Sequence, residues 1–351
     1  MIQKISFKLV LLLFTILGFF NFKKNDVVVI CCPLFIGDMI FLFPLIRALK
    51  MNKPYRKIIF LCREEFTSLL KLNSDIDQVC ALNKSALNVL KIYRIIVNAD
   101  YFYTPMADYW RRLALATHAK NIISFDCKKN INALRFSGVN KPQHVSEYLL
   151  ELLPVNEVAE INGEPFLLES ASYPNLLVIQ CDGRNLNTKS FTDAQLKQIF
   201  EIVKSFPVKI QLMGLYKPLN ELNLPNVIDL RGKSSFDEWL NYILGARFVI
   251  GLDSAAAQLR KAVGKSAFIL MGPADDLFFG NTPLFPNITI TSRNDLSCRD
   301  RKVFQGQFFE SLNNCQKNVC NNPIGKICID GEIFITFLDS IRENLELIFK
   351  V

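Results

Sequence analysis

Short apolar runs alternate with amphipathic stretches along most of the chain. In the first half, runs such as DVVVICC (26–32) and KIIFLC (57–62) alternate with helical patterns such as GDMIFLFPLIRALKMN (37–52). Continuous apolar runs of this length are typical of parallel strands that are covered on both faces. Strand–helix alternation therefore predicts an α/β fold with a doubly wound sheet.

A second series of the same kind follows a polar stretch that contains Pro and Gly, residues 160–175, which we interpret as a linker. The second half therefore predicts a second doubly wound sheet, and the whole chain predicts two Rossmann-like domains, over 26–165 and 166–351, that face each other across a cleft. The strands expected in the second domain are LLVIQC (176–181), VKIQLMG (208–214), NVIDLRG (226–232), FVIGLD (248–253) and SAFILMG (266–272).

The first 25 residues have a different pattern. An apolar run of twelve residues, 9–20, has lysines on both flanks, and no small-x-small cleavage site follows it. A helix that spans a bilayer needs roughly 17 to 25 residues. We expect a segment that associates with an anionic membrane surface, with a short spanning anchor, a cleaved signal or a buried helix as alternatives.

Composition narrows the class of protein. Half of the residues are hydrophobic, and the net charge of +8 comes from scattered basic residues. This distribution disfavours a nucleic-acid partner and suits an anionic substrate or an acidic membrane surface. Of the ten cysteines, Cys31, Cys32 and Cys181 lie at the ends of apolar runs, where a reduced cysteine behaves as a small hydrophobic residue, and a chain of this length does not depend on disulfides. We therefore expect a reducing, cytoplasmic compartment.

Candidate chemistry lies first at Gly37-Asp38, where a predicted strand passes into a helix. A dinucleotide-binding fingerprint would read G-x-G-x-x-G, and only Gly37 is present, so NAD and FAD are disfavoured. Two roles are open for Asp38. It can cap the helix, or it can act as a partly desolvated general base.

Two junctions in the second domain suit a phosphate. In QCDGRNLNTKSF (180–191), the backbone at Gly183 and the cations Arg184 and Lys189 can hold a phosphate, although a solvated loop is the alternative. In GLDSAAAQLRKAVG (251–264), Asp253-Ser254 opens an Ala-rich helix whose first N–H groups can bind a diphosphate.

The junction at Asp253-Ser254 has an alternative interpretation, and a second loop is expected beside it. Asp253 or Ser254 can simply cap the helix, with alanines chosen for helix propensity. In the functional interpretation, small side chains such as Ala255 let a ligand approach the backbone. The MGPADD loop, which includes Gly272, is then a wall of the same pocket.

Five stretches carry a resemblance to a known family: IGDMIFLFPLIRALK, HVSEYLLELL, DGRNLNTKSF, ARFVIGLDSAAAQLRKAVGK and MGPADDLFFG. In order and with compatible spacing, they resemble glycosyltransferase family 9, which contains the lipopolysaccharide heptosyltransferases. The resemblance implies a GT-B fold, with the acceptor mainly on the N-terminal domain and the nucleotide-sugar donor on the C-terminal one. It implies that Asp38 is the catalytic base, that Lys189 contacts donor phosphate, and that Asp253 and Ser254 lie at the donor diphosphate.

The chain departs from this family at two positions. Ala255 replaces a Gly, and Gln258 stands where the family usually has a His. A Gln can donate a hydrogen bond to a phosphate, but it cannot carry a proton or a charge. A donor other than ADP-heptose, or a non-catalytic nucleotide-sugar-binding scaffold, therefore stays open.

The remaining candidates are weaker. Arg63 and Arg112, with Gly37, are expected on the acceptor side, with a solvated face as the alternative for the arginines. His144 opens a helix that matches one in the family's N-terminal domain. We expect no metal, because no Asp-x-Asp triplet is present and the C-terminal cysteines, Cys298, Cys315, Cys320 and Cys328, lack a zinc spacing.

These observations together predict an inverting, metal-independent glycosyltransferase without a cofactor. Its donor would be a nucleotide sugar, expected to be ADP-linked and to carry heptose or a related sugar. Its acceptor would be a lipopolysaccharide core or another surface glycan, reached at the cytoplasmic face of the inner membrane.

Overall fold

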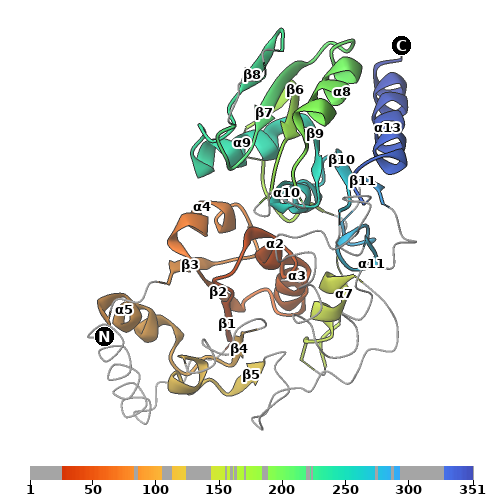
Figure 1. The fold of residues 1–351 in the computed structure, drawn as a ribbon. Coiled ribbons are helices and arrows are strands. Elements are labelled where there is room, and N and C mark those ends of the chain that lie inside the picture. The colour runs from red at the N-terminus through yellow and green to blue at the C-terminus, as the bar shows by residue number, and fades with distance from the viewer. Residues whose placement is uncertain are drawn as a thin grey trace. The chain divides into compact units, whose positions relative to one another are not determined.

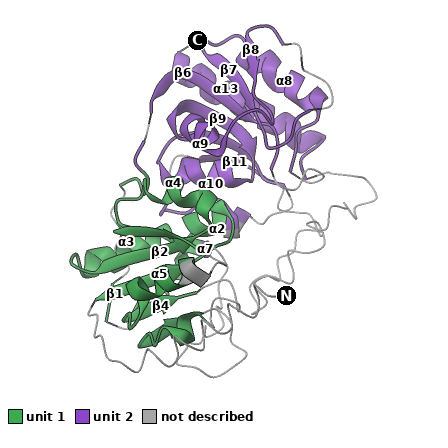
Figure 2. Ribbon diagram, turned by 90° about the vertical axis from the view of Figure 1, so that its left-hand side faces the viewer, with its two compact units in different colours: residues 1–137, 146–167 green, residues 138–145, 168–351 purple. Residues whose placement is uncertain are grey.

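The chain forms two compact units in a computed structural model (Figure 2). Unit 1 comprises residues 1–137 and 146–167, and unit 2 comprises residues 138–145 and 168–351. The structure describes residues 26–82, 86–104, 113–123, 144–154, 156–158, 161, 164–169, 171–183, 189–218, 222, 224–272, 276–285, 288–292 and 328–350.

Unit 1 is built on a parallel sheet of five strands in the order β3-β2-β1-β4-β5 (Figure 1). Every residue of β1 is buried, as expected for a strand covered on both faces. The strands are β1 (Val27–Cys31), β2 (Lys57–Cys62), β3 (Gln78–Ala81), β4 (Tyr101–Tyr103) and β5 (Asn121–Ile123). The helical segments are α2 (Ile36–Ile40), α3 (Phe43–Asn52), η1 (Glu64–Phe66), α4 (Thr67–Leu70), α5 (Ala86–Ile96) and α7 (Val145–Leu150).

The single helix predicted over residues 37–52 is wrong. The structure has two helices there, and the break falls at Phe41 and Leu42, just before Pro44 at the start of α3. A proline inside a continuous helix would lack its N–H and would clash with the carbonyl of Ile40. The break leaves α2 as a short helix that carries Gly37 and Asp38 directly after β1.

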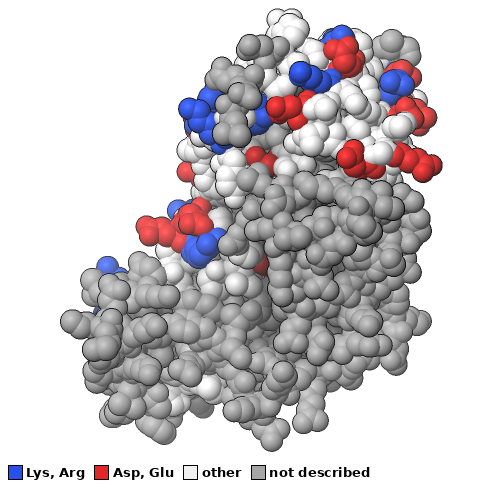
Figure 3. Space-filling model, in the orientation of Figure 1, with Lys and Arg blue, Asp and Glu red and all other residues white. Residues whose placement is uncertain are grey.

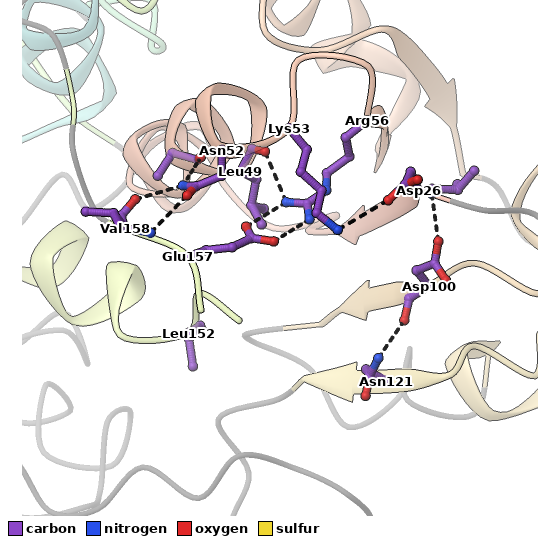
Figure 4. A network of polar contacts seen from close by, with 12 residues as sticks. Asp26, Leu49, Asn52, Lys53, Arg56, Asp100, Asn121, Leu152, Glu157 and Val158 are labelled. Atoms are coloured by element: carbon purple, nitrogen blue, oxygen red, sulfur yellow. Dashed lines mark hydrogen bonds and ion pairs between the residues drawn. The ribbon is translucent and has the colours of Figure 1, made fainter. Parts of the chain in front are cut away.

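The last segment of unit 1 is fixed to α3 and to the turn before β2 by two arginines and one amide, of which Figure 4 shows Arg56 and Asn52. The Arg56 guanidinium, 1% exposed, pairs with both carboxylate oxygens of Glu157, and its Nη1 lies 2.7 Å from Oε2. Asn52 exchanges two hydrogen bonds with the backbone of Val158, at 2.8 and 2.9 Å. Arg47 donates to the carbonyls of Glu164 and Pro165. These contacts explain why residues 146–167 return to unit 1.

Unit 2 is built on a parallel sheet of six strands in the order β11-β10-β9-β6-β7-β8. Helices α8 and α13 share one core with the sheet, and α9 and α10 contact each other and the strands β6 and β9 (Figure 1). The strands are β6 (Tyr173–Gln180), β7 (Lys209–Met213), β8 (Val227–Asp229), β9 (Ala246–Leu252), β10 (Ala267–Leu270) and β11 (Ile288–Thr291). The helices are α8 (Asp193–Val203), α9 (Phe236–Gly245), α10 (Ala255–Ala262), α11 (Asp276–Phe279) and α13 (Glu332–Phe349).

The predicted fold class, two Rossmann-like doubly wound sheets, is confirmed. Strand β11 and helix α13 extend the second unit beyond the elements that its sequence pattern had indicated. Acidic and basic side chains lie next to one another on the described surface seen in Figure 3. The apolar segment 1–25 lies outside the described residues, and none of the described helices is both long and apolar enough to cross a membrane.

Candidate functional site

The strand order of unit 2 reverses at β6 and β9, which are neighbours in the sheet. From β6 the chain proceeds to β7 and β8 on one side, and from β9 to β10 and β11 on the other. Ligands of open α/β sheets bind at such switch points, outside the carboxyl ends of the strands. The predicted loops at Gly183 and at Asp253-Ser254 follow these two strands directly.

An ion pair joins the two loops. The Lys189 ammonium lies 2.7 Å from Oδ2 of Asp253, whose residue is 6% exposed. The carbonyl of Lys189 in turn accepts a hydrogen bond from the Gly183 amide at 2.7 Å. The structure thus brings together three of the predicted donor-binding residues.

The start of α10 carries an unpartnered hydroxyl. Ser254 is the N-cap residue with extended backbone, yet its side chain makes no capping bond, and its Oγ is buried without a hydrogen-bond partner among the described residues. The first N–H groups of a helix have no intrahelical acceptor. Ala255 begins the helix, and small side chains follow it. This set of donors and the helix dipole suit an anion.

Gly183 leaves space beside this helix start. A Cβ atom built on Gly183 would lie 3.4 Å from Cβ of Lys189 and 3.6 Å from Cβ of Ser254, which is ordinary van der Waals contact. Packing among the described residues therefore does not demand glycine. The space that a Cβ atom would take lies between Lys189 and Ser254.

Gln258 directs its amide group toward other parts of the protein. Its Nε2 contacts Asp253 Oδ1 at 3.5 Å and the carbonyl of Phe279 at 3.4 Å, so its amide hydrogens point to the protein. Its Oε1 is buried and has no hydrogen-bond partner among the described residues. The group of Gln258 that is left without a partner is therefore an acceptor, and its expected contact with a donor phosphate stays a prediction.

Sequence reasoning missed the residues that support the β6 loop. Gln180 donates to the carbonyl of Asp182 at 2.7 Å and accepts from the indole N–H of Trp239 at 2.8 Å. Burial raises the pKa of the Asp182 carboxyl, although the backbone N–H of Leu215, 2.7 Å away, opposes this shift. The available signal was Gln180 itself, a polar residue inside an otherwise apolar strand.

Lys261 was also missed. It is 3% exposed and lies on α10, seven residues after Ser254 and three after Gln258, which places the three side chains on one face of the helix. Its ammonium donates to the carbonyls of Phe279 and Gly280, both at 2.6 Å. The helical spacing was the signal that could have revealed it.

In unit 1, Asp38 caps the helix on which it lies. Its Oδ2 accepts a hydrogen bond from the Phe35 amide at 3.2 Å, and the residue is half-buried. Burial raises the pKa of the neighbouring Cys32 thiol, and the Asp38 carboxylate raises it further, so this thiol stays protonated. The structure therefore contains the capping contact of Asp38. Its role as a general base stays a prediction.

Arg63 lies near the same loop. It follows β2, the neighbour of β1, and its guanidinium carbon lies 5.7 Å from the ring centroid of Phe35 and 4.5 Å from that of Phe66. It also pairs with Glu65 at 3.0 Å. Gly37 is the second residue of α2 and is half-buried. The structure thus gathers Gly37, Asp38 and Arg63 at the carboxyl ends of adjacent strands.

The other predicted residues lie away from these contacts or outside the described residues. Gly272 is buried and follows β10. Arg112 and Arg184 lie outside the described residues, as do Cys298, Cys315 and Cys320. Among the residues that are described, no group of three or more His, Cys, Asp or Glu side chains could hold a metal ion. His144, expected with the N-terminal domain, belongs to unit 2, where its ring lies 5.9 Å from that of Phe285.

Comparison with known proteins adds information about the fold. No protein-family profile matches the sequence, and no curated protein matches it significantly. A glycosyltransferase family 9 structure from Veillonella parvula is similar over 93% of this chain and 99% of its own, with 16% identity and a TM-score of 0.67.

Two Escherichia coli structures show the same similarity. Heptosyltransferase WaaC with ADP covers 84% of this chain and 100% of its own, at 15% identity and a TM-score of 0.59. ADP-heptose lps heptosyltransferase II covers 90% of this chain and 99% of its own, at 13% identity and a TM-score of 0.58. The chain therefore has the GT-B fold of the family 9 glycosyltransferases, which confirms at the level of the fold the resemblance found in its sequence.

Proposed function

We propose that the chain is a glycosyltransferase whose unit 2 binds a nucleotide-sugar donor. The observation that carries the proposal is the unpartnered Ser254 hydroxyl at the start of α10, beside the Lys189–Asp253 pair at the strand switch point. Backbone N–H groups, a hydroxyl and a lysine are the groups that recognise phosphate. The similar WaaC structures contain ADP and ADP-2-deoxy-2-fluoro heptose, which supports a nucleotide-sugar ligand.

The proposed reaction is an inverting transfer. Asp38 removes the proton from an acceptor hydroxyl, and that oxygen attacks the anomeric carbon of the donor in line with the departing nucleoside diphosphate. The bond from the anomeric carbon to the diphosphate oxygen breaks through an oxocarbenium-like transition state. The N–H groups at the start of α10, with Ser254 and Lys189, stabilise the charge that develops on the leaving group. Metal independence is part of this proposal.

Donor and acceptor are proposed from the resemblance alone. The donor would be an ADP-linked heptose or a related sugar, and the acceptor a lipopolysaccharide core or another surface glycan. Arg63, at the carboxyl end of β2, supplies a cation for an anionic acceptor. Segment 1–25 would hold the enzyme at the cytoplasmic face of the inner membrane and raise the effective concentration of a lipid-linked acceptor.

One observation favours a second candidate, a nucleotide-sugar-binding scaffold without catalysis. Two groups that could otherwise contact a diphosphate are occupied: Lys189 pairs with Asp253, and the amide hydrogens of Gln258 point to Asp253 and Phe279. A scaffold needs to hold the donor but does not need to stabilise a leaving group. It would therefore tolerate this arrangement.

The experiment measures nucleoside diphosphate release from a panel of ADP-, UDP- and GDP-sugars by the full chain. Asp38→Asn should lower the rate by about 10²- to 10⁴-fold, the usual contribution of a general base. Asp193→Asn, at an exposed acid in the first turn of α8, is the matched control and should leave the rate unchanged. A wild type that binds a donor but never turns it over supports the scaffold, and full activity of Asp38→Asn removes Asp38 as the base.

A further inference from the structure

One face of α10 carries three side chains whose hydrogen bonding is incomplete. Ser254, Gln258 and Lys261 follow a spacing of four and then three residues, which aligns them along one side of the helix. Ser254 Oγ and Gln258 Oε1 are both buried and lack a partner among the described residues. The third side chain, Lys261, lacks an acceptor for one of its N–H groups among the described residues.

The Lys261 ammonium has three N–H donors, and only two acceptors among the described residues contact it. Its Nζ donates to the carbonyls of Phe279 and Gly280, and no other acceptor contacts it within the described part of the chain. No carboxylate among the described residues lies within ion-pair distance of it, although the residue is only 3% exposed. A buried cation without a counter-ion is costly. The arrangement is therefore suited to an anionic ligand.

The neighbouring Arg260 shows what a purely structural cation looks like in the same helix. It is fully buried, and its guanidinium donates to a whole set of backbone carbonyls. These carbonyls belong to Ile243, Leu244, Ala246, Arg247 and Ser266. Arg260 fixes α10 to the segments around it, whereas the Lys261 ammonium keeps one N–H group without an acceptor among the described residues.

Lys261 lies within the polar network of the candidate site. Side chains on a helix lean toward its N-terminus, so the Lys261 side chain leans toward Ser254. The Phe279 carbonyl that accepts from Lys261 also contacts Gln258 Nε2 at 3.4 Å, and that amide contacts Asp253. The network runs from Lys189 through Asp253 and Gln258 to Lys261.

The charged and titratable groups around Lys261 do not neutralise it. Burial lowers the pKa of Lys261 to about 8, and Asp253 only partly opposes this shift. Asp253 is already paired with Lys189. Burial also lowers the pKa of His144 well below its usual value, with Lys261 adding to the effect, so His144 is neutral near pH 7.

We propose that Lys261 is the buried cation of the donor site, and that its ammonium group binds the diphosphate portion of the nucleotide sugar together with Ser254 and the start of α10. This inference rests on the proposed function. It gives the site the positive charge that Gln258 does not have. It also implies that an anionic ligand favours the protonated lysine, so that binding near pH 8 takes up a proton.

The test is calorimetric titration of the full chain with ADP and with inorganic pyrophosphate, in buffers of different ionisation enthalpy. Lys261→Gln keeps N–H donors for the carbonyls of Phe279 and Gly280 but removes the charge. We expect it to bind about 10- to 100-fold more weakly, the range for losing a hydrogen bond from a charged group. We expect the wild type at pH 8 to take up about half a proton on binding ADP, which is itself fully ionised at that pH, and the variant to take up none.

Lys265→Gln is the matched control, because Lys265 lies close by in sequence, pairs with Glu169 and makes no contact with the network. It should bind as the wild type does. Equal affinity and equal proton uptake in Lys261→Gln would overturn this inference alone. A wild type that binds neither ADP nor pyrophosphate would overturn the proposed function and this inference with it. If Lys261→Gln does not fold, the wild-type proton uptake decides, and its absence at pH 8 counts against Lys261.

Discussion

The ammonium of Lys189 lies 2.7 Å from a carboxylate oxygen of Asp253, although the two residues are 64 positions apart. They lie in the two loops that follow the adjacent parallel strands β6 and β9. The pair orients a cation at the point where the strand order of unit 2 reverses. Because the two residues contact each other, a substitution of Lys189 tests whether this lysine binds a ligand or only neutralises Asp253.

Replacing Lys189 should weaken donor binding more than it affects stability. Lys189 is partly exposed, and the amide of a Gln can still donate to the buried Asp253 carboxylate, which Gln258 also contacts, so Lys189→Gln should lower the free energy of unfolding by only about 1 kcal/mol. Binding of ADP should weaken about tenfold or more, because a charge-assisted contact to phosphate is lost. Titration at two salt concentrations checks this, with the exposed Lys197→Gln on α8 as the control. Unchanged ADP affinity in Lys189→Gln would show that this lysine only serves Asp253.

Gly183→Ala should lower nucleotide affinity without lowering the stability of the fold. The added Cβ would meet only ordinary contacts with Lys189 and Ser254, so the melting temperature should stay close to that of the wild type. The added methyl group would take up space between Lys189 and Ser254, where we propose that the diphosphate binds, so nucleotide affinity should fall. Gly214→Ala is the opposite control, because its Cβ would lie 2.4 Å from Oδ2 of Asp182 and should cost about 1–3 kcal/mol of stability. A Gly183→Ala protein with normal affinity would place the ligand elsewhere.

Two substitutions at Asp38 should separate its capping role from its proposed role as a base. Asn can still accept the hydrogen bond from the Phe35 amide, so Asp38→Asn should keep the stability of the wild type. Asp38→Ala loses the cap and should lower the free energy of unfolding by about 1 kcal/mol. Both should lose nucleoside diphosphate release. Chemical denaturation and the release assay on the same samples check this, and equal stabilities would argue against the cap.

The Arg56–Glu157 pair should control the stability of unit 1. Glu157→Gln would leave the buried Arg56 guanidinium without its counter-ion and should lower the free energy of unfolding by about 3 kcal/mol. Glu151→Gln, at an exposed acid of the same returning segment, should have little effect. Urea unfolding followed by fluorescence measures both. A loss below about 0.5 kcal/mol in Glu157→Gln would mean that the segment is held by its other contacts.

Lys261 should give the free energy of unfolding a specific pH dependence. Its pKa is about 8 in the folded chain against 10.5 ordinarily, so the unfolded state binds more protons between pH 8 and 10.5. The wild type should therefore gain stability relative to Lys261→Met as the pH rises from 8 toward 10. Urea unfolding of both proteins at pH 7.5, 8.5 and 9.5 measures the difference. A difference that does not change with pH would contradict a buried, uncompensated ammonium.

The loops of the candidate site could be predicted because each is marked by the residues directly next to it in the sequence. Apolar runs mark β1, β6 and β9, and polar or small residues after each run mark Asp38, Gly183 and Ser254. Since parallel strands end at one edge of a sheet, the donor-site residues were expected together before any distance was known. The break before Pro44 was also encoded locally, but the strong apolar pattern on both sides obscured it.

The sequence by itself determined the two doubly wound sheets and the loops that carry the candidate chemistry, because hydrophobic period and turn residues act over a few positions. Only the tertiary structure decided how polar groups far apart in sequence share their hydrogen bonds. It turned the amide hydrogens of Gln258 toward Asp253 and left Lys261 buried against two carbonyls. Those outcomes depend on which loop packs against α10, and periodicity along the chain carries no information about that packing.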